Sequence, residues 1–256
     1  MKKILAMLLA GVMLLTCLVA CGKKDDKNDD VELVGGAQES VYNGFAYETN
    51  KDGDFTIIGY RKETTSESTL SIPATIDERP VTGIANGAFK ANLAKSISIP
   101  EGIVTIGDTA FYDCDNLTAV KIPSTVTKVG KAAFSNCEKL SYITLSSEMT
   151  EIADYTFRDC VSLAAITVTD KITSIGAGAF MGCTALKNVA LPAGLTDIGD
   201  AAFVNCPALS AITLPAGLTN IGTFIFSKEA GTKLTVTAGS KAEEYAQTNE
   251  YIYVAK

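Results

Sequence analysis

Five cysteines recur at intervals of 23 residues, and their thiols are the first side chains in this sequence that could do chemistry. Each stands three residues before a leucine; they are Cys114, Cys137, Cys160, Cys183 and Cys206. A catalytic thiol needs a base such as histidine to activate it, and zinc sites use closely spaced pairs of cysteines. The sequence has no histidine, and single cysteines 23 residues apart form no such pairs. The interval therefore predicts a column of free thiols that are buried as small apolar side chains.

A disulfide framework is the alternative for these cysteines, because an exported protein meets oxidising conditions. Residues that repeat once per coil can come within bridging distance of their neighbours. Five cysteines cannot all pair, however, and side chains that point inward in parallel do not face one another. We therefore expect free thiols that donate weakly to backbone carbonyls.

Three aspartates also recur at one repeat position in alternate units: Asp108, Asp154 and Asp200. Strand spacing would place them about 9–10 Å apart, a separation that the two carboxylates of an inverting glycosidase could use. The intervening units hold lysine, alanine and threonine at this position, which is the variation expected of a solvated turn. We predict no catalytic residue, no metal site and no cofactor, so the protein is not expected to be an enzyme.

A repeat of about 23 residues positions these side chains. Each unit reads close to "IGxxAFxxCxxLxxIxIPxxLTx", and the phenylalanines are spaced by 22 residues once and by 23 thereafter. A fixed period of this length is the signature of a solenoid, in which stacking buries faces that no unit can cover alone. The phenylalanine column comprises Phe89, Phe111, Phe134, Phe157, Phe180, Phe203 and Phe226.

Each unit combines one short strand with one turn. In "LTAVKIP", Val120 and Ile122 alternate around an exposed Lys121 as in a strand, and Pro123 ends the strand because it has no backbone donor. The preceding "IGDTAFYDC" contains a glycine turn and a half-turn that is compatible with a helix. We predict a single right-handed stack of coils, with short parallel β-strands and helical half-turns.

The segment "IGDTAFYDCDNLTAVKIPSTVTKVG" strongly resembles the bacterial leucine-rich repeats of BspA type, and the resemblance spans about residues 72–240. The first unit, "KANLAKSISIP", departs from the pattern by lacking one residue and the cysteine, and Ser146 and Thr169 replace the usual proline. The resemblance implies an α/β-type leucine-rich-repeat solenoid. It also implies a surface protein of a kind often associated with adhesion to host matrix proteins or to other cells.

Caps are expected at both ends of the solenoid, because its terminal strand edges would otherwise be exposed. "FAYETNKDGDFTIIGYR" is typical of a β-hairpin around "KDGD"; the acidic turn echoes part of a calcium loop but lacks the further ligands. Near the C-terminus, Ser240 can cap a short helix that precedes a strand in "YIYV". The predicted organisation is an N-terminal β cap at 41–83, repeats at 84–233 and a helix and strand cap at 234–256.

The N-terminus has the pattern of an export signal. A positive start, "MKK", precedes an apolar stretch, and "LVAC" at residues 18–21 resembles the lipobox of bacterial lipoproteins. The resemblance implies that residues 1–20 are a cleaved signal peptide and that Cys21 is attached to membrane lipid. Residues 21–40 are then a flexible tether, and the protein lies at the extracytoplasmic face of the cell membrane, exposed on the surface. A short membrane helix is the alternative for the apolar stretch.

Charge and surface composition limit the possible partners. The chain has 22 basic and 29 acidic residues, which argues against nucleic acid because phosphate binding needs a positive surface. We expect a monomeric, non-catalytic protein-binding or adhesion module with an extracellular protein or glycan as partner. The alternative is a structural or carbohydrate-contacting component of the cell envelope without a dedicated protein ligand.

The candidate binding surface consists of outward positions on the strands and of the turns beside the phenylalanines. The strand positions are small and rich in hydroxyl groups, with Tyr142 as their only aromatic residue. The strand candidates are Lys121, Tyr142, Thr144, Thr167 and Asn188, and the turn candidates are Tyr112, Tyr155 and Arg158.

Overall fold

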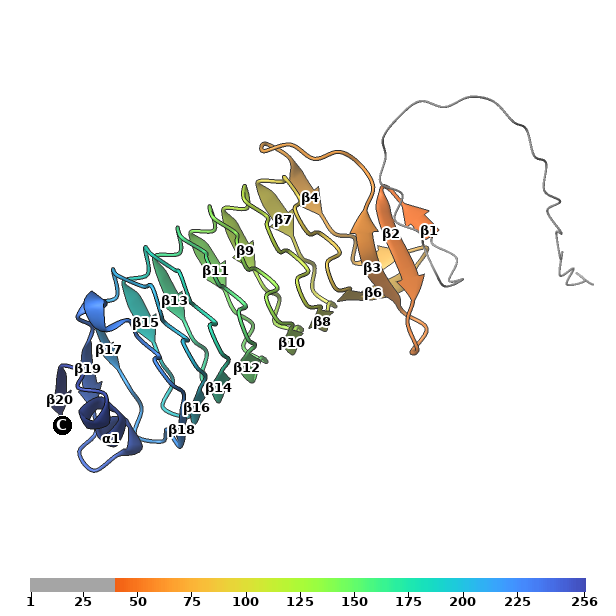
Figure 1. Cartoon of the computed structure of the whole chain (residues 1–256). Helices are drawn as coiled ribbons and strands as arrows, with labels where there is room; N and C mark the ends of the chain where they lie inside the picture. Colours follow the sequence, from red (N-terminus) through yellow and green to blue (C-terminus); the bar gives the residue numbers. More distant parts are fainter. Residues whose placement is uncertain (1–39) are drawn as a thin grey trace, which may run out of the picture. The chain divides into compact units, whose positions relative to one another are not determined.

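The structure, a computed structural model, describes residues 40–256, which belong to one compact unit (Figure 1). The predicted signal peptide, lipid attachment at Cys21 and all but the last residue of the predicted tether lie outside the described residues. Within residues 40–256, no helix has both the length and the apolar character needed to cross a membrane.

Residues 84–236 form a β-solenoid, which confirms the predicted stack of coils (Figure 1). We number coils 1 to 7 by their phenylalanines, from Phe89 to Phe226. Coils 2 to 7 each contain a two-residue back strand, a turn that carries the phenylalanine (the Phe turn) and a front strand. The back strands are β8 (Thr105–Ile106), β10 (Lys128–Val129), β12 (Glu151–Ile152), β14 (Ser174–Ile175), β16 (Asp197–Ile198) and β18 (Asn220–Ile221). The front strands are β7 (Ser96–Ser98), β9 (Ala119–Lys121), β11 (Tyr142–Thr144), β13 (Ala165–Thr167), β15 (Asn188–Ala190), β17 (Ala211–Thr213) and β19 (Lys233–Val236).

Neighbouring coils pair in parallel and in register. Tyr142 of β11 lies beside Ala119 of β9, and Ile175 of β14 lies beside Ile198 of β16. The front strands nevertheless form three groups in the described chain, β4-β7-β9-β11, β13-β15 and β17-β19-β20, and a single residue pair joins β7 to β9. The back strands are interrupted once, between β10 and β12. Between coils 3 and 4, therefore, neither the front strands nor the back strands pair, whereas the Phe turns of the two coils are hydrogen-bonded.

The core is a continuous stack of like side chains. The seven phenylalanines are buried, with consecutive ring centroids 5.1–5.9 Å apart and ring planes within 4–19° of parallel. The cysteine column and the leucines that follow it are buried beside them. Apolar burial on this scale is the main force that holds the coils together.

The Phe turns differ from the helical half-turns that the sequence predicts. In coil 2, the N–H groups of Thr109, Phe111 and Asp113 donate to carbonyls of coil 3, whereas the residues between them donate three residues back within their own coil. Thr109 and Asp113 have φ values of 53° and 59°, a left-handed conformation that an α-helix excludes. Partners on the next coil satisfy the alternate N–H groups, so the segment forms turns instead of a helix.

A glycine after five of the six back strands, all except β12, allows neighbouring coils to approach closely. A Cβ atom added at Gly176 would lie 2.5 Å from the backbone nitrogen of Asp154 in coil 4, and the glycines of coils 2, 3, 6 and 7 are equally crowded. Coil 4 has Ala153 at this position. Its phenylalanine ring is 5.9 Å from that of coil 3, the widest spacing in the stack. We attribute the break between β10 and β12 to the Ala153 methyl group.

Antiparallel strands precede the solenoid, and a helix and a strand follow it. Three strands pair in antiparallel order, β1 (Ser40–Tyr42), β2 (Phe45–Thr49) and β3 (Phe55–Tyr60). β3 also pairs in parallel with β6 (Arg79–Ile84). This end is completed by β4 (Thr69–Ser71), which pairs with β7, and β5 (Thr75–Ile76), which pairs with β6. In the turn between β2 and β3, the Asn50 side chain accepts the N–H groups of Asp52 and Asp54. After β19 come α1 (Lys241–Thr248) and β20 (Tyr253–Ala255); the 3₁₀ helix η1 (Lys228–Ala230) precedes β19. The Ser240 side chain accepts the Glu243 N–H at the start of α1.

Candidate binding surface on the front strands

The front strands expose alternate residues because successive side chains of a strand point to opposite faces. In β9, Ala119 and Lys121 are exposed while Val120 is buried, and β13 and β17 repeat this alternation. In β11 the third residue, Thr144, is half-buried. The outward first and third positions of the front strands from β7 to β17 make up what we call the front face. The buried middle residues of the strands hold this face in place. The side chains of the face itself point to solvent and contribute little to the core.

Among residues 40–256, we distinguish three hollows on the front face. Two lie where the front strands separate, between β11 and β13 and between β15 and β17, and the third lies where a single residue pair joins β7 to β9. Hollow 1–2, between coils 1 and 2, has a volume of about 450 Å³. Hollow 3–4 has about 350 Å³ and hollow 5–6 about 480 Å³. Each therefore falls within the range typical of small-ligand sites, although all three are open to solvent.

Tyr142 is the dominant side chain of the front face. It is 62% exposed and lines both hollow 1–2 and hollow 3–4. Its neighbours at the same strand position are alanines, Ala119 in coil 2 and Ala165 in coil 4. The Thr144 hydroxyl donates to the Tyr142 phenol oxygen over 3.2 Å. The aromatic ring thus stands between two hollows and beside small neighbours.

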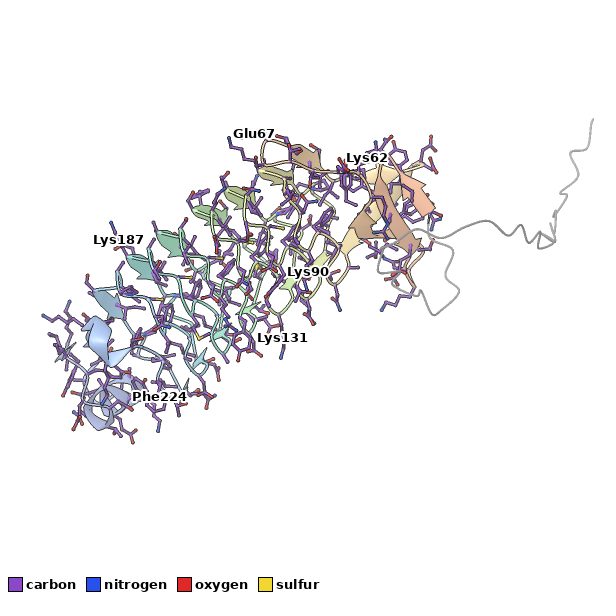
Figure 2. All side chains as sticks on the ribbon, turned by 45° about the horizontal axis from the view of Figure 1, so that its top comes forward. Lys62, Glu67, Lys90, Lys131, Lys187 and Phe224 are labelled. Atoms are coloured by element: carbon purple, nitrogen blue, oxygen red, sulfur yellow. The ribbon has the colours of Figure 1, made fainter. Side chains whose placement is uncertain are left out.

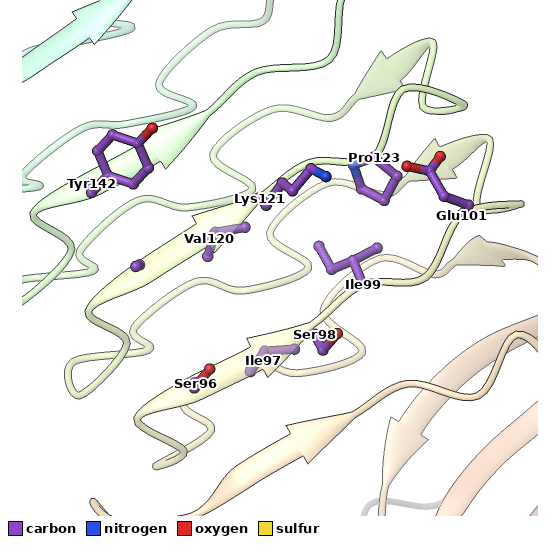
Figure 3. Close-up of a pocket in the computed structure, with 10 residues that line it drawn as sticks. Ser96, Ile97, Ser98, Ile99, Glu101, Val120, Lys121, Pro123 and Tyr142 are labelled. Atoms are coloured by element: carbon purple, nitrogen blue, oxygen red, sulfur yellow. The ribbon is translucent and has the colours of Figure 1, made fainter.

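Hollow 1–2 also contains the only charged side chains that line any of the three hollows, Lys121 and Glu101. Figure 3 shows the Lys121 chain extending along the strand toward Pro123 and Glu101, with Tyr142 on the other side. Lys121 is one of the candidates that the sequence predicts. Glu101 and Pro123 were not among them. Glu101 lies three residues after the end of β7 and Pro123 two residues after the end of β9, in the turns that leave the front strands.

The structure places the other strand candidates along the same face. Thr144 and Thr167 line hollow 3–4, and Asn188 lines hollow 5–6. The three turn candidates lie on the Phe turns, away from these hollows, and have partners within the chain. Asn136 donates to the Tyr112 phenol oxygen over 3.2 Å, and Arg158 forms an ion pair with Asp159 over 3.1 Å.

Tyr155, the remaining turn candidate, packs against the next coil. A Cβ atom added at Gly178 would lie 2.6 Å from two carbons of the Tyr155 ring, so the ring covers that glycine. The Arg158 guanidinium carbon is 6.0 Å from the centre of the same ring. The turn candidates therefore do not join the strand candidates in one site.

The five cysteines are free and buried, as predicted. Each thiol donates to the carbonyl of the phenylalanine one coil earlier, over 3.1–3.2 Å. Burial raises the pKa of Cys160 and of Cys206 to about 12. These two thiols are consequently protonated at neutral pH, which is opposite to what a nucleophile requires.

The recurring aspartates have a structural role. The carboxylate of Asp108 accepts the Lys131 N–H at 2.8 Å, that of Asp154 accepts the Ala177 N–H at 2.9 Å, and Asp200 does the same for Thr223. Asn86 uses its side-chain oxygen in the same way in coil 1. Each side chain thus caps a backbone donor of the next coil, and the recurrence of Asp or Asn at this repeat position is the signal for that role in the sequence.

Electrostatics agree with this structural role. A hydrogen bond from the Lys131 ammonium, 2.8 Å away, lowers the pKa of Asp154, and the bonds from Thr223 lower the pKa of Asp200. A general acid requires a raised carboxyl pKa. Within residues 40–256, no group of three or more acidic, cysteine or histidine side chains is arranged to hold a metal ion.

Comparison with protein families identifies the repeats. Residues 82–170 and 150–239 match the family described as "BspA type Leucine rich repeat region (6 copies)". Among the curated proteins, none matches this chain.

Solved structures show the same architecture. A leucine rich cell surface protein from Faecalibacterium prausnitzii A2-165 is 30% identical, with a TM-score of 0.69 over 82% of this chain and 56% of that one. A leucine-rich repeat protein from Bacteroides ovatus is 21% identical, with a TM-score of 0.53 over 79% of this chain and 66% of that one. A leucine-rich repeat protein from T. pallidum is 24% identical, with a TM-score of 0.52 over 86% of this chain and 100% of that one. The chain therefore spans less than two thirds of the first two proteins, and the two less identical ones share its fold.

Proposed function

The chain belongs to the BspA-type leucine-rich repeat family, and from this premise we propose that it is a bacterial surface lipoprotein whose solenoid is a non-catalytic adhesion module. Its front face binds an extracellular protein or glycan. Cys21 joins the chain to membrane lipid, residues 21–40 act as the tether, and the solenoid works as a monomer on the outer side of the membrane.

The observation that carries this proposal is the front face itself, with its row of three hollows beside one exposed tyrosine. A rigid stack presents this row without rearrangement, which lowers the entropic cost of binding. The groups that could do chemistry are occupied elsewhere, because the thiols bind carbonyls and the aspartates bind backbone N–H groups. The similar F. prausnitzii protein is a leucine rich cell surface protein, which supports the location.

Cell-based experiments test the location and the adhesion separately. Bacteria that express the full chain should retain it in the membrane fraction, and Cys21→Ser should release it into the soluble fraction. A Cys21→Ser protein that stays with the membrane would contradict lipid attachment.

Adhesion is tested with the same cells on surfaces coated with matrix proteins, glycans or cell-wall fragments. Cells that express the chain should adhere to at least one of these surfaces more strongly than cells that lack it. Tyr142→Ala should abolish the difference, whereas Tyr155→Ala, at an exposed tyrosine of a Phe turn, should preserve it. Equal adhesion by all four strains would refute the proposed function and favour a structural envelope component.

A further inference from the structure

The three hollows have a regular spacing. They lie between coils 1 and 2, 3 and 4, and 5 and 6, so neighbouring hollows are separated by two coils. The front strands between them, β9 with β11 and β13 with β15, are paired. Two strand spacings correspond to about 9–10 Å along the solenoid axis. A ligand that fits all three hollows must therefore repeat at this distance.

The lining of the hollows matches the chemistry of sugars. A sugar ring presents C–H groups that pack on the face of an aromatic ring, and Tyr142 is exposed beside alanines on both sides. The two hollows that it lines also contain hydroxyl groups that can donate to or accept from sugar hydroxyls, from Ser96 and Ser98 in hollow 1–2 and from Thr144, Thr167 and Thr169 in hollow 3–4. An apolar floor with a few convergent polar groups is the usual composition of a small-ligand site.

Charge and anchor residues favour a neutral glycan over a protein or a polyanion. Lys121 and Glu101, of opposite sign, are the only charged residues that line the three hollows. Protein interfaces concentrate their affinity in clusters of tyrosine, tryptophan and arginine. The hollows contain one tyrosine and no arginine, whereas stacking of one sugar needs only a single ring.

We propose that the front face binds an extended, neutral β-1,4-linked glycan along the solenoid axis, with one sugar stacked on Tyr142. Such a chain repeats every two sugars, because successive rings are flipped, and the length of this repeat is comparable to two coils. Equivalent sugars then occupy successive hollows. This inference rests on the proposed function and specifies its ligand class.

Calorimetric titration of the detergent-solubilised full chain with cellohexaose and chitohexaose tests the inference, with the corresponding disaccharides for comparison. At least one hexasaccharide should bind about tenfold or more tightly than its disaccharide, because it reaches more than one hollow. Tyr142→Ala should weaken hexasaccharide binding about tenfold, the loss expected when one stacking contact is removed. Tyr142→Phe should retain most of the affinity because it retains the ring.

Two further variants separate the hollows from the rest of the surface. Ala211→Arg, in hollow 5–6 and far from Tyr142, should weaken binding of the hexasaccharide but not of the disaccharide. Tyr155→Ala should change neither. Co-sedimentation with insoluble cellulose, chitin and peptidoglycan then distinguishes the natural sources of such a chain.

The inference is overturned if neither hexasaccharide binds, if a disaccharide binds as tightly as its hexasaccharide, or if Tyr142→Ala and Ala211→Arg have no effect. The results that would overturn the glycan ligand differ from those that would overturn the proposed adhesion function. Cells that adhere to a matrix protein through Tyr142 while the chain ignores both hexasaccharides would refute the glycan ligand and leave the adhesion module intact.

Discussion

Replacing Ala153 with glycine should stabilise the protein, although glycine usually destabilises a strand or its flank. Between coils 4 and 5, the N–H groups of Thr173 and Gly176 donate to carbonyls of coil 4 over 2.9 and 2.8 Å. Within residues 40–256, the equivalent bonds from Thr150 and Ala153 to coil 3 are missing, where β10 and β12 separate. Removing the Ala153 methyl group should let the two coils close and form these bonds.

The magnitude follows from the two recovered bonds. Each backbone hydrogen bond contributes about 0.5–1.5 kcal/mol net, so two contribute about 1–3 kcal/mol. Glycine costs about 0.5–1 kcal/mol in chain entropy relative to alanine. We therefore expect Ala153→Gly to raise the free energy of unfolding by up to about 2.5 kcal/mol. The reverse change, Gly176→Ala, should lower it by a similar amount, because its Cβ would lie 2.5 Å from the Asp154 nitrogen.

Urea denaturation of the unsubstituted protein, Ala153→Gly and Gly176→Ala measures the effect on global stability. Amide hydrogen exchange at residues 150 and 153 measures the local effect. In Ala153→Gly both amides should exchange more slowly, while amides in coils 1 and 7 should be unchanged, since each coil contacts only its neighbours. If Ala153→Gly lowered the free energy of unfolding by about 0.5–1 kcal/mol and left exchange at these two amides unchanged, the reasoning would be refuted. That result would show that something other than the methyl group separates coils 3 and 4.

Three further predictions concern the core, the thiols and the carboxylates. Phe157→Ala removes a fully buried ring from the middle of the stack and should cost about 3–5 kcal/mol in urea denaturation; a cost below about 1 kcal/mol would mean that the ring is not part of the core. The five cysteines of the repeats should react slowly with an alkylating reagent in the native protein and rapidly in urea, because they are buried and burial raises the pKa of Cys160 and Cys206 to about 12; rapid native labelling, counted by mass spectrometry, would contradict this. The pKa of Asp154 is lower in the folded than in the unfolded chain, so its contribution to stability is present above about pH 4 and is lost as the pH falls below that value. Asp154→Asn keeps the kind of side-chain oxygen that Asn86 uses in coil 1, so it should change the free energy of unfolding at pH 7 by less than about 1 kcal/mol. It should also make the decline of that free energy between about pH 5 and 2 shallower. Urea midpoints that decline equally with pH in both proteins would exclude this role for the carboxylate.

The stack of coils could be predicted from the sequence because one constraint repeats. Residues at the same repeat position must share one environment, so the columns of phenylalanine, cysteine and leucine directly indicate a shared core. The thiol hydrogen bonds were also predictable, since a buried donor of this size has only nearby carbonyls as partners. The interval alone therefore determined both the placement of the five cysteines and their chemistry.

The Phe turns and the breaks between coils were not predicted. "DTAFYDC" has no proline and is compatible with a helix, and only the carbonyls of the next coil make the alternating turn the better solution. The effect of Ala153 depends on how closely two backbones approach, which a repeat pattern does not contain. The repeated glycine at this position was the available signal in the sequence, since glycine in coils 2, 3, 5, 6 and 7 and alanine in coil 4 imply a difference in the spacing of the coils.

Some properties of the candidate binding residues depend only on nearby sequence, and others depend on how the coils stack. Strand alternation is a local property, so the outward placement of Lys121, Tyr142 and Thr167 followed from the sequence. The hollows that these residues line depend on where the front strands separate, and no local pattern indicates this. The partners of Tyr112 and Tyr155 lie in neighbouring coils, and for this reason the sequence could not show that these side chains are already in use.

The in-register pairing of the coils also bears on how such a chain can change its length. Each middle coil offers the same upper and lower contacts to its neighbours, with phenylalanine on phenylalanine and isoleucine on isoleucine. Unequal recombination within the gene can therefore insert or delete 23 residues and still join compatible surfaces. Evolution can lengthen or shorten the protein in whole coils without redesigning its interior.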